Sequence, residues 1–173
     1  MARINFIIVI LGGLLLSCSQ TKKLSSTYTP LTVLTYNIHH ASPPAYPKDF
    51  IDLDTIAATI KASHAELVAI QELDSMTIRS HKVFQLKVLA EKLGMYYHFE
   101  RTIPYEGGAY GIGILSKYPL SAVKGYQLPE ITGIPTEPRK VVMAKVIINK
   151  LPVYFGCTHF DNKSKDEIGR AHV

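Results

Sequence analysis

The sequence predicts an α/β fold that opens with a strand, a helix and a second strand. Residues 31–38 (LTVLTYNI) and 67–70 (LVAI) are short apolar runs rich in β-branched residues, which is typical of buried strands. Between them, four apolar residues recur at the spacing of one helix face: Leu53, Ile56, Ala57 and Ile60. Because strand–helix–strand connections are right-handed crossovers, we expect the two strands to be parallel neighbours in one sheet.

The remaining elements follow in order along the chain. Asp52 is expected to cap the first helix, after a loop over residues 39–47 that its prolines indicate. A polar loop over 74–80 precedes a second helix over 82–93, which Gly94 is expected to end. Further strands are expected over 96–103, 112–115, 123–128, 140–148 and 153–158, with turns over 104–108 and 149–152.

Each of the first two strands leads into a polar side chain. Asn37 closes the first strand, and Glu72 ends the second. In a parallel pair the two side chains would lie side by side at the carboxyl edge of the sheet, where α/β proteins bind ligands. A carboxylate next to a buried strand is costly unless its charge is stabilised, and a metal ion is one such partner. An ordinary surface position for Glu72 is the alternative.

Four short motifs resemble those of a known superfamily. They are Thr-Tyr-Asn-Ile at 35–38, Gln-Glu-Leu-Asp at 71–74, Leu-Ser-Lys-Tyr-Pro-Leu at 115–120 and Cys-Thr-His-Phe-Asp at 157–161. Together they resemble the endonuclease/exonuclease/phosphatase superfamily, the DNase I-like metal-dependent phosphodiesterases. The resemblance implies a four-layer sandwich of two mixed β-sheets flanked by helices. Residues 31–167 would be its N-terminal portion, because the superfamily's later Asp-x-Asn and Ser-Asp-His motifs have no counterpart.

The same resemblance implies roles for five residues. Asn37 and Glu72 would hold Mg²⁺ or Mn²⁺, which agrees with the preference of hard ions for oxygen ligands. His159 would lie near the scissile phosphate as hydrogen-bond donor or general acid. Arg139 would reach the phosphate, and Tyr110, in a glycine-rich turn, is a candidate to border the substrate. The alternatives are a core histidine, an exposed arginine beside a strand and an ordinary turn.

For several other residues we expect a structural role rather than a catalytic one. His39 and His40 are expected to be a poor pair of metal ligands, since adjacent residues on a strand point to opposite faces. Asp74 and Arg79 are expected in a solvated loop after Glu72, and contact with substrate is the alternative for each. Asp161 is expected to orient the loop that carries His159. Of the two cysteines, Cys157 is expected to be a small buried residue, and no disulfide is expected.

Both ends of the chain are expected to lie outside the folded domain. Residues 1–17 predict an export signal, whose apolar run is too short to span a bilayer. The run ends at Leu-Leu-Ser-Cys18, which resembles a bacterial lipobox, so Cys18 would carry lipid and residues 18–30 would form a tether. An ordinary signal peptide is the alternative. Residues 168–173 match one frame of a common sequencing adapter and are expected to be non-native, unless residues 165–167 begin a helix.

Taken together, these features predict a metal-dependent phosphodiesterase or phosphatase, monomeric and held at the bacterial cell envelope, facing the periplasm or the exterior. The net charge of +5 suits phosphate-bearing substrates, but there is no basic run beyond Lys22-Lys23 to indicate nucleic-acid binding. The substrate class therefore stays open between nucleic acid and phospholipid. The alternative function is a non-catalytic surface lipoprotein that uses the fold as a binding module.

Overall fold

The computed structural model describes residues 30–47, 49–129 and 137–160. The chain divides into two units, Met1–Pro30 and Leu31–Val173, and the elements below all belong to the second. The export signal over 1–17, Cys18, the tether up to residue 29, the tail over 168–173 and Asp161 lie outside the described residues.

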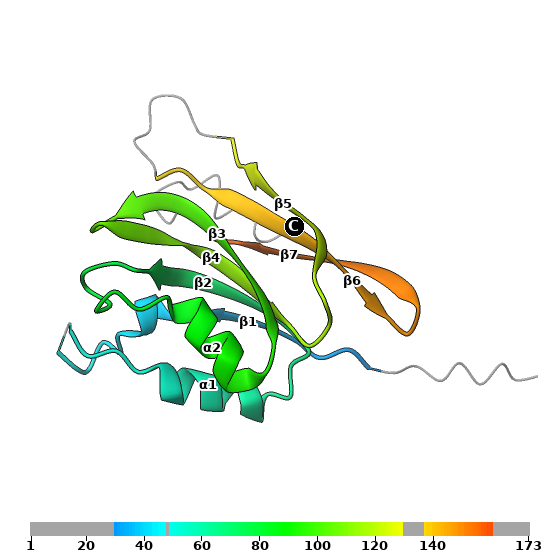
Figure 1. The fold of residues 1–173 in the computed structure, drawn as a ribbon, viewed down its shortest axis with the longest axis horizontal. Helices are drawn as coiled ribbons and strands as arrows, with labels where there is room; N and C mark the ends of the chain where they lie inside the picture. Colours follow the sequence, from blue (N-terminus) through cyan, green and yellow to red (C-terminus); the bar gives the residue numbers. More distant parts are fainter. Residues whose placement is uncertain (1–29, 48, 130–136, 161–173) are drawn as a thin grey trace, which may run out of the picture. The chain divides into compact units, whose positions relative to one another are not determined.

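The first sheet is mixed and has the strand order β1-β2-β4-β3 (Figure 1). Its strands are β1 (Val33–Asn37), β2 (Leu67–Ser75), β3 (Tyr96–Tyr105) and β4 (Gly108–Ser116). The β1 and β2 strands pair in parallel, as predicted, and β4 lies antiparallel to both β2 and β3. Because β3 and β4 are longer than predicted, the turn between them narrows to residues 106–107.

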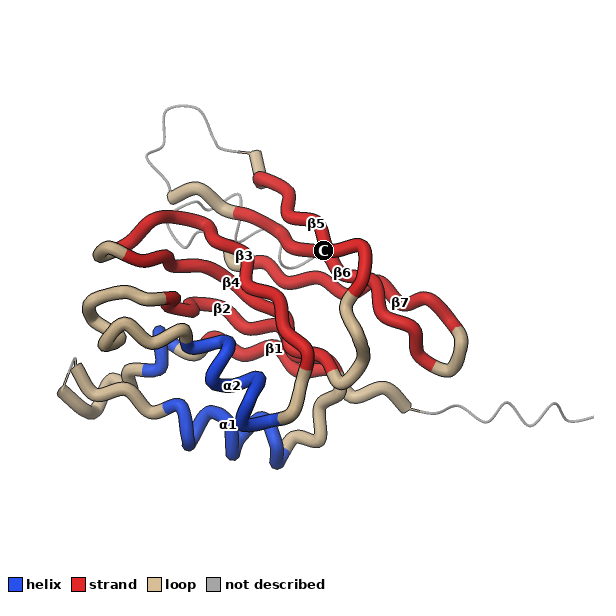
Figure 2. The backbone as a smooth tube through the Cα atoms, in the orientation of Figure 1, coloured by secondary structure: helices blue, strands red, loops and turns tan. Residues whose placement is uncertain are grey.

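Two helices cover one face of this sheet (Figure 2). Helix α1 (Leu53–Ala62) is capped by Asp52, whose Oδ1 accepts from Thr55 N at 2.9 Å. Helix α2 (Gln85–Leu93) begins three residues later than predicted and ends at Gly94, which has a left-handed φ of 65°. The apolar faces of both helices form one core with the strands; its members include Ile56, Ile60, Leu86, Leu89, Val68 and Ile70.

The second sheet packs on the opposite face of the first. It contains β5 (Ser121–Gln127), β6 (Lys140–Ile148) and β7 (Leu151–Thr158), in that order. A second core lies between the sheets and joins Ala69, Ile112 and Ile114 to Val142, Ala144 and Cys157. All pairings among the described strands of this sheet are antiparallel. The two packed sheets, with helices on one side, agree with the predicted sandwich, of which this chain forms a part. Within the described ranges, no helix covers its outer face.

The loop predicted after β1 begins with a short turn. His39–Ala41 form a 3₁₀ turn, η1, in which His39 and His40 have φ values of 47° and 43°. The residues that come next, Ser42 to Pro47, run as a loop along the same end of the sheet. Among the helices of the described residues, none is both long enough and apolar enough to cross a membrane.

Candidate functional site

Strand β2 contains a β-bulge at the residues that carry the site. Ile70 pairs with Gly113 and Leu73 with Gly111, so Gln71 and Glu72 together lie opposite a single residue of β4. A bulge of this kind adds one residue and redirects the side chains next to it. Ile70 and Leu73 both reach the helix-side core, while Glu72 has a φ of 60°. Glu72 is therefore inside a strand that runs to Ser75, and the expectation that the strand ends at Glu72 was wrong.

The structure brings Asn37, Glu72 and His159 together. Asn37 Nδ2 donates to Glu72 Oε1 at 2.8 Å, and His159 Nε2 lies 3.7 Å from the same oxygen. The three residues come from the end of β1, the bulge in β2 and the residue just after β7. The Glu72 and His159 side chains are 21% and 24% exposed, so they are sheltered but open to solvent. One carboxylate oxygen is thus shared by an amide and an imidazole from two different sheets.

A buried polar link joins the two sheets directly beside this group. Gln71 Nε2 donates to Thr35 Oγ1 at 3.1 Å and to Cys157 Sγ at 3.6 Å, while Cys157 Sγ donates to Ile70 O at 3.4 Å. Burial raises the pKa of the Cys157 thiol to about 11, so the thiol is neutral, as expected for a small buried residue. This link holds the end of β7, and with it His159, against β2.

Tyr110 and Arg139, the two predicted substrate contacts, also lie near Glu72. Tyr110 pairs with Asp74 across β2 and β4 and is half-buried. Burial and the charge of Glu72 raise the pKa of Tyr110, while the charge of Arg139 acts in the opposite direction. The Arg139 side chain is 11% exposed, and its Nη2 lies 3.5 Å from Glu137 Oε2. The tyrosine hydroxyl is therefore a neutral donor placed between charges of both signs.

A cavity of ≈ 200 Å³ opens beside Glu72. Its lining residues come from four parts of the chain: His40, Glu72, Arg79, Ile103, Tyr105, Tyr110 and Glu137. A second hollow of ≈ 600 Å³ adjoins it along the loop after η1, and both are lined by His40, Arg79 and Tyr105. Space for a substrate group therefore exists next to the Glu72 carboxylate.

Asp74 and Arg79 are not in a solvated loop, and that expectation was wrong. Asp74 is fully buried, and Arg79 binds it through two hydrogen bonds, Nε to Oδ2 at 2.7 Å and Nη2 to Oδ1 at 2.8 Å. Thr77 Oγ1 donates to Asp74 Oδ2 at 2.8 Å. The guanidinium carbon lies 4.3 Å from the ring centroid of Tyr105. Arg79 is thus a rigidly held cation on the cavity wall, because bidentate pairing and ring stacking both restrict it.

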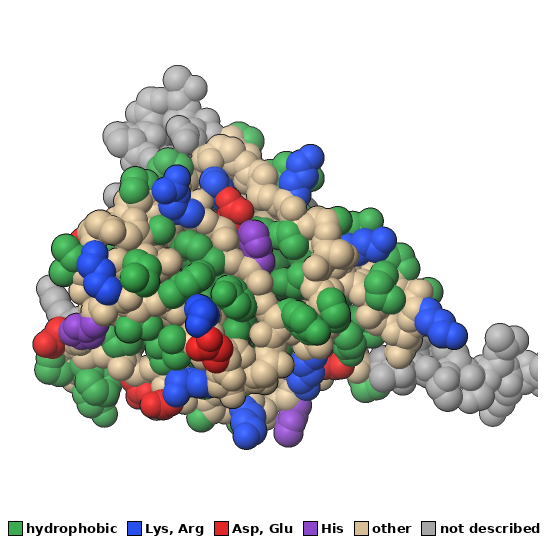
Figure 3. Space-filling model, viewed as in Figure 1, with side chains coloured by type: hydrophobic (Ala, Val, Ile, Leu, Met, Phe, Trp, Pro, Cys, Tyr) green, Lys and Arg blue, Asp and Glu red, His purple; other side chains and the backbone are tan. Residues whose placement is uncertain are grey.

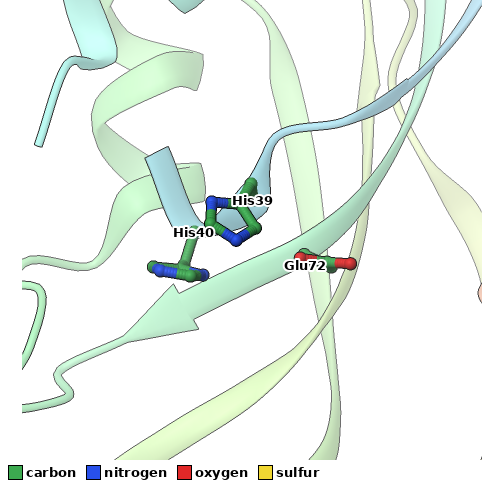
Figure 4. A group of neighbouring side chains, drawn as sticks. All are labelled: His39, His40 and Glu72. Atoms are coloured by element: carbon green, nitrogen blue, oxygen red, sulfur yellow. The ribbon is translucent and has the colours of Figure 1, made fainter. Parts of the chain in front are cut away.

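The prediction for His39 and His40 rested on strand geometry, and it was wrong on that point. The η1 turn places the two rings side by side, with centroids 4.3 Å apart. Together with Glu72 they offer potential ligand atoms within 4.8 Å of one another (Figure 4). Burial lowers the pKa of His40, and the charges of Arg79 and His39 lower it further. The prolines already predicted a loop over residues 39–47, so the strand geometry assumed for the two side chains did not apply there.

The donor set at Glu72 fits a hard divalent ion. Glu72 supplies an anionic oxygen, whereas Asn37 directs its Nδ2 at that carboxylate and its Oδ1 at His39 N. One or two carboxylates with several retained waters are the usual ligands of Mg²⁺. Glu72 has a second oxygen besides the one that Asn37 contacts, and the neighbouring cavity leaves room for water. Glu72 would therefore hold the ion, with Asn37 fixing the direction of its carboxylate.

Comparisons with known proteins bear on the family and the fold of the chain. The family model described as "Endonuclease/Exonuclease/phosphatase family" matches residues 34–165. A comparison with curated proteins found no significant match. Among solved structures, the endonuclease/exonuclease/phosphatase from Beutenbergia cavernae is 24% identical, with a TM-score of 0.58, and the match covers 74% of this chain and 37% of that one.

Two further structures have similar folds. An endonuclease/exonuclease/phosphatase family protein from Leptotrichia buccalis is 17% identical with a TM-score of 0.61, covering 80% of this chain and 58% of that one. The human Nocturnin catalytic domain with bound sulfate is 15% identical with a TM-score of 0.59, covering 82% and 53%. The fold is the DNase I-like α/β sandwich, and the chain spans between 37% and 58% of the length of these three structures.

Proposed function

The chain belongs to the endonuclease/exonuclease/phosphatase family, and on that premise we propose that it forms part of a metal-dependent phosphoric ester hydrolase. The proposal is carried by one observation, the sharing of Glu72 Oε1 between Asn37 Nδ2 and His159 Nε2. Phosphoryl transfer depends mainly on positioning and on neutralising the phosphoryl oxygens. A carboxylate for the ion and an imidazole for the proton, held this close, are the two groups that such a reaction requires.

Each residue has a distinct task in this proposal. Glu72 would hold Mg²⁺ or Mn²⁺, which when bound neutralises phosphoryl oxygens and acidifies a water. Asn37 holds the Glu72 carboxylate in place through its Nδ2 donor. His159 Nε2 would donate a hydrogen bond or a proton to the phosphoryl or leaving oxygen. The buried Gln71–Cys157 contact keeps His159 in register with the carboxylate.

Arg139 and Tyr110 would bind the phosphoester. A guanidinium offers a planar fork that matches two phosphoryl oxygens. Burial keeps the Tyr110 hydroxyl protonated, so it can donate to an oxygen of the substrate. Tyr110 lines the Glu72 cavity, and the charge of Arg139 acts on the Tyr110 hydroxyl. These positions support a contact of both residues with the same phosphoryl group.

The substrate class proposed is a phosphodiester of nucleic acid or phospholipid. On the face seen in Figure 3, Lys and Arg side chains are scattered rather than gathered in one patch. A continuous basic stripe is the usual footprint of nucleic-acid binding.

The lipobox-like segment ending at Cys18 supports a place at the bacterial cell envelope, on a lipid anchor. Cys18→Ala would then release the protein from membranes, and unchanged retention in a membrane fraction would contradict the anchor.

The test measures metal-dependent hydrolysis by the full reading frame of the gene. With bis-p-nitrophenyl phosphate as probe, turnover is expected with Mg²⁺ or Mn²⁺ and not with chelator. Glu72→Gln removes the charge that holds the ion, so activity should fall steeply and recover partly at high metal. The activity of His159→Ala should be about 10²–10⁴-fold lower and should not recover at high metal, since the substitution removes a proton donor.

Glu91→Gln is the matched control, because Glu91 is an exposed carboxylate on α2 that pairs with Lys87. It should leave turnover unchanged. Equal activity of wild type and Glu72→Gln would overturn the hydrolase proposal and favour the non-catalytic binding module. Metal-independent turnover would also contradict it.

A further inference from the structure

The turn that follows β1 places two imidazoles beside the Glu72 carboxylate. His39 and His40 are consecutive residues of η1, and their rings are neighbours because the positive φ values curl the backbone. Figure 4 shows both rings on the turn, with Glu72 on the facing strand β2. The metal-dependent hydrolase proposed above uses Glu72 and Asn37 but gives no task to either histidine.

The hydrogen bonds of the two rings leave nitrogen atoms available. His39 Nδ1 donates to Ser42 O at 2.7 Å, which directs the lone pair of a neutral ring to Nε2. Metal-binding histidines commonly donate their other ring N–H to a backbone carbonyl in this way. His40 Nδ1 is buried and has no hydrogen-bond partner among the described residues. A buried ring nitrogen without a partner costs free energy that a ligand would recover.

The backbone of the turn is fixed independently of any ion. Gln85, which is fully buried at the start of α2, donates from Nε2 to His40 O at 2.6 Å and accepts from Asp74 N at 2.9 Å. Asn37 Oδ1 accepts from His39 N at 3.0 Å. Both histidines are therefore held by hydrogen bonds from β1 and α2, and the cluster does not depend on a freely moving loop.

We propose that His39, His40 and Glu72 form a site for a transition-metal ion of the Zn²⁺ class. Two imidazoles and one carboxylate are the ligands that zinc accepts in open three-ligand sites, and imidazole disfavours Mg²⁺. The ligand atoms lie within 4.8 Å of one another. Tetrahedral zinc requires ligand atoms about 3.3 Å apart, so modest side-chain rotation closes the site. The inference stands on this geometry and does not require that the protein hydrolyse phosphoesters.

Co²⁺ is the probe, since its visible absorption reports nitrogen ligands and tetrahedral geometry. The purified chain should bind Co²⁺ with visible bands, and Zn²⁺ should displace it. His39→Gln and His40→Gln should each weaken Zn²⁺ binding at least about tenfold in a chelator competition, since losing even a group that only orients a metal ligand costs about that much. The double variant should lose the visible bands altogether.

His64→Gln is the matched control, because His64 is exposed just after α1 and far along the chain from the cluster. It should keep wild-type binding. Circular dichroism checks that each variant is folded. If the double variant unfolds, the Zn²⁺ affinities of the two single variants test the proposal. Absence of Co²⁺ bands in the wild type, or equal Zn²⁺ affinity in wild type and both single histidine variants, would overturn the proposal. Mg²⁺-dependent hydrolysis is measured separately with the phosphodiester probe, so failure of the zinc site and failure of the hydrolase proposal are told apart, although both sites use the Glu72 carboxylate.

Discussion

Asp74 is a fully buried carboxylate whose charge is balanced by Arg79. Two hydrogen bonds connect the pair, and Thr77 donates a third to the carboxylate. Such a pair contributes little net stability compared with apolar residues, but removing one partner leaves a buried charge unbalanced. The pair also fixes the cavity wall beside Glu72, because Arg79 lines that cavity. Stability and site geometry are thus coupled at this residue pair.

Arg79→Met should therefore lower the free energy of unfolding by about 3 kcal/mol. This is the lower part of the range for breaking a buried pair, because a quarter of the Arg79 side chain is exposed. Urea denaturation measures the change. Lys87→Met is the control, since Lys87 pairs with Glu91 on the exposed face of α2 and should leave the midpoint almost unchanged. Similar midpoints for both variants would contradict the role of the buried pair.

At the residue scale, motif and strand-end reasoning found part of the site. Asn37, Glu72 and His159 were selected from the sequence, and the structure places them within hydrogen-bond or ion-pair distance of one oxygen. The tasks of these residues in catalysis stay predictions. The cluster of His39, His40 and Glu72 was missed because the two histidines were assumed to point to opposite faces, as on a strand. Positive φ values curl the backbone there and bring the two rings together. Asp74 was missed because a buried charge is visible only when its partner is placed.

At the scale of elements, Gly111 lets β3 and β4 approach next to the bulge. A Cβ on Gly111 would lie 2.2 Å from Glu100 O, a backbone atom that cannot move without disturbing the ladder. Gly111 also faces Leu73 across β2 and directly follows Tyr110. Glycine is needed here because the strands approach too closely, where their registers shift, to leave room for a Cβ.

Gly111→Ala should destabilise the fold by about 1–3 kcal/mol, the usual cost of forcing an extra carbon into a packed site. Thermal denaturation followed by circular dichroism measures the loss. Gly94→Asn is the control: no atom lies within 4 Å of a Cβ at Gly94, and asparagine tolerates its left-handed φ of 65° at a helix end. A Gly111→Ala protein as stable as wild type would show that the strands can separate at little cost.

Periodicity predicted most of the elements but not the bulge. The parallel β1–β2 pair, helix α1 and the end of α2 at Gly94 agree with the sequence analysis. The extension of β2 to Ser75 was missed because the polar Gln71-Glu72 pair looks like the end of an apolar run. A bulge conserves the burial of Ile70 and Leu73 while breaking the alternation that marks a strand. Strand boundaries at a bulge depend on the partner strand, which one segment of sequence does not contain.

At the scale of the whole molecule, the two faces of the second sheet differ. Val142, Ala144 and Val146 of β6 are buried toward the first sheet. The residues between them point outward, and their neighbours on that face include Ile147, Tyr154 and Tyr126, which are 50%, 66% and 46% exposed. No described helix covers this outer face. Lys124 and Lys145 lie on the same face, between these apolar side chains. Exposed apolar side chains favour association with another surface.

The 173-residue chain should therefore self-associate through the outer face of the second sheet. Ile147→Lys combined with Tyr154→Lys should shift the chain toward monomer in sedimentation experiments and reduce binding of an apolar dye, because both side chains are exposed. Val146→Lys is the contrasting variant: it adds one lysine to the same strand, but on the buried face, so it should unfold the sheet. If the double variant associates as strongly as wild type while remaining folded, the outer face is not the contact surface. If wild type is monomeric and binds no dye, the exposed side chains are too scattered to act as one patch.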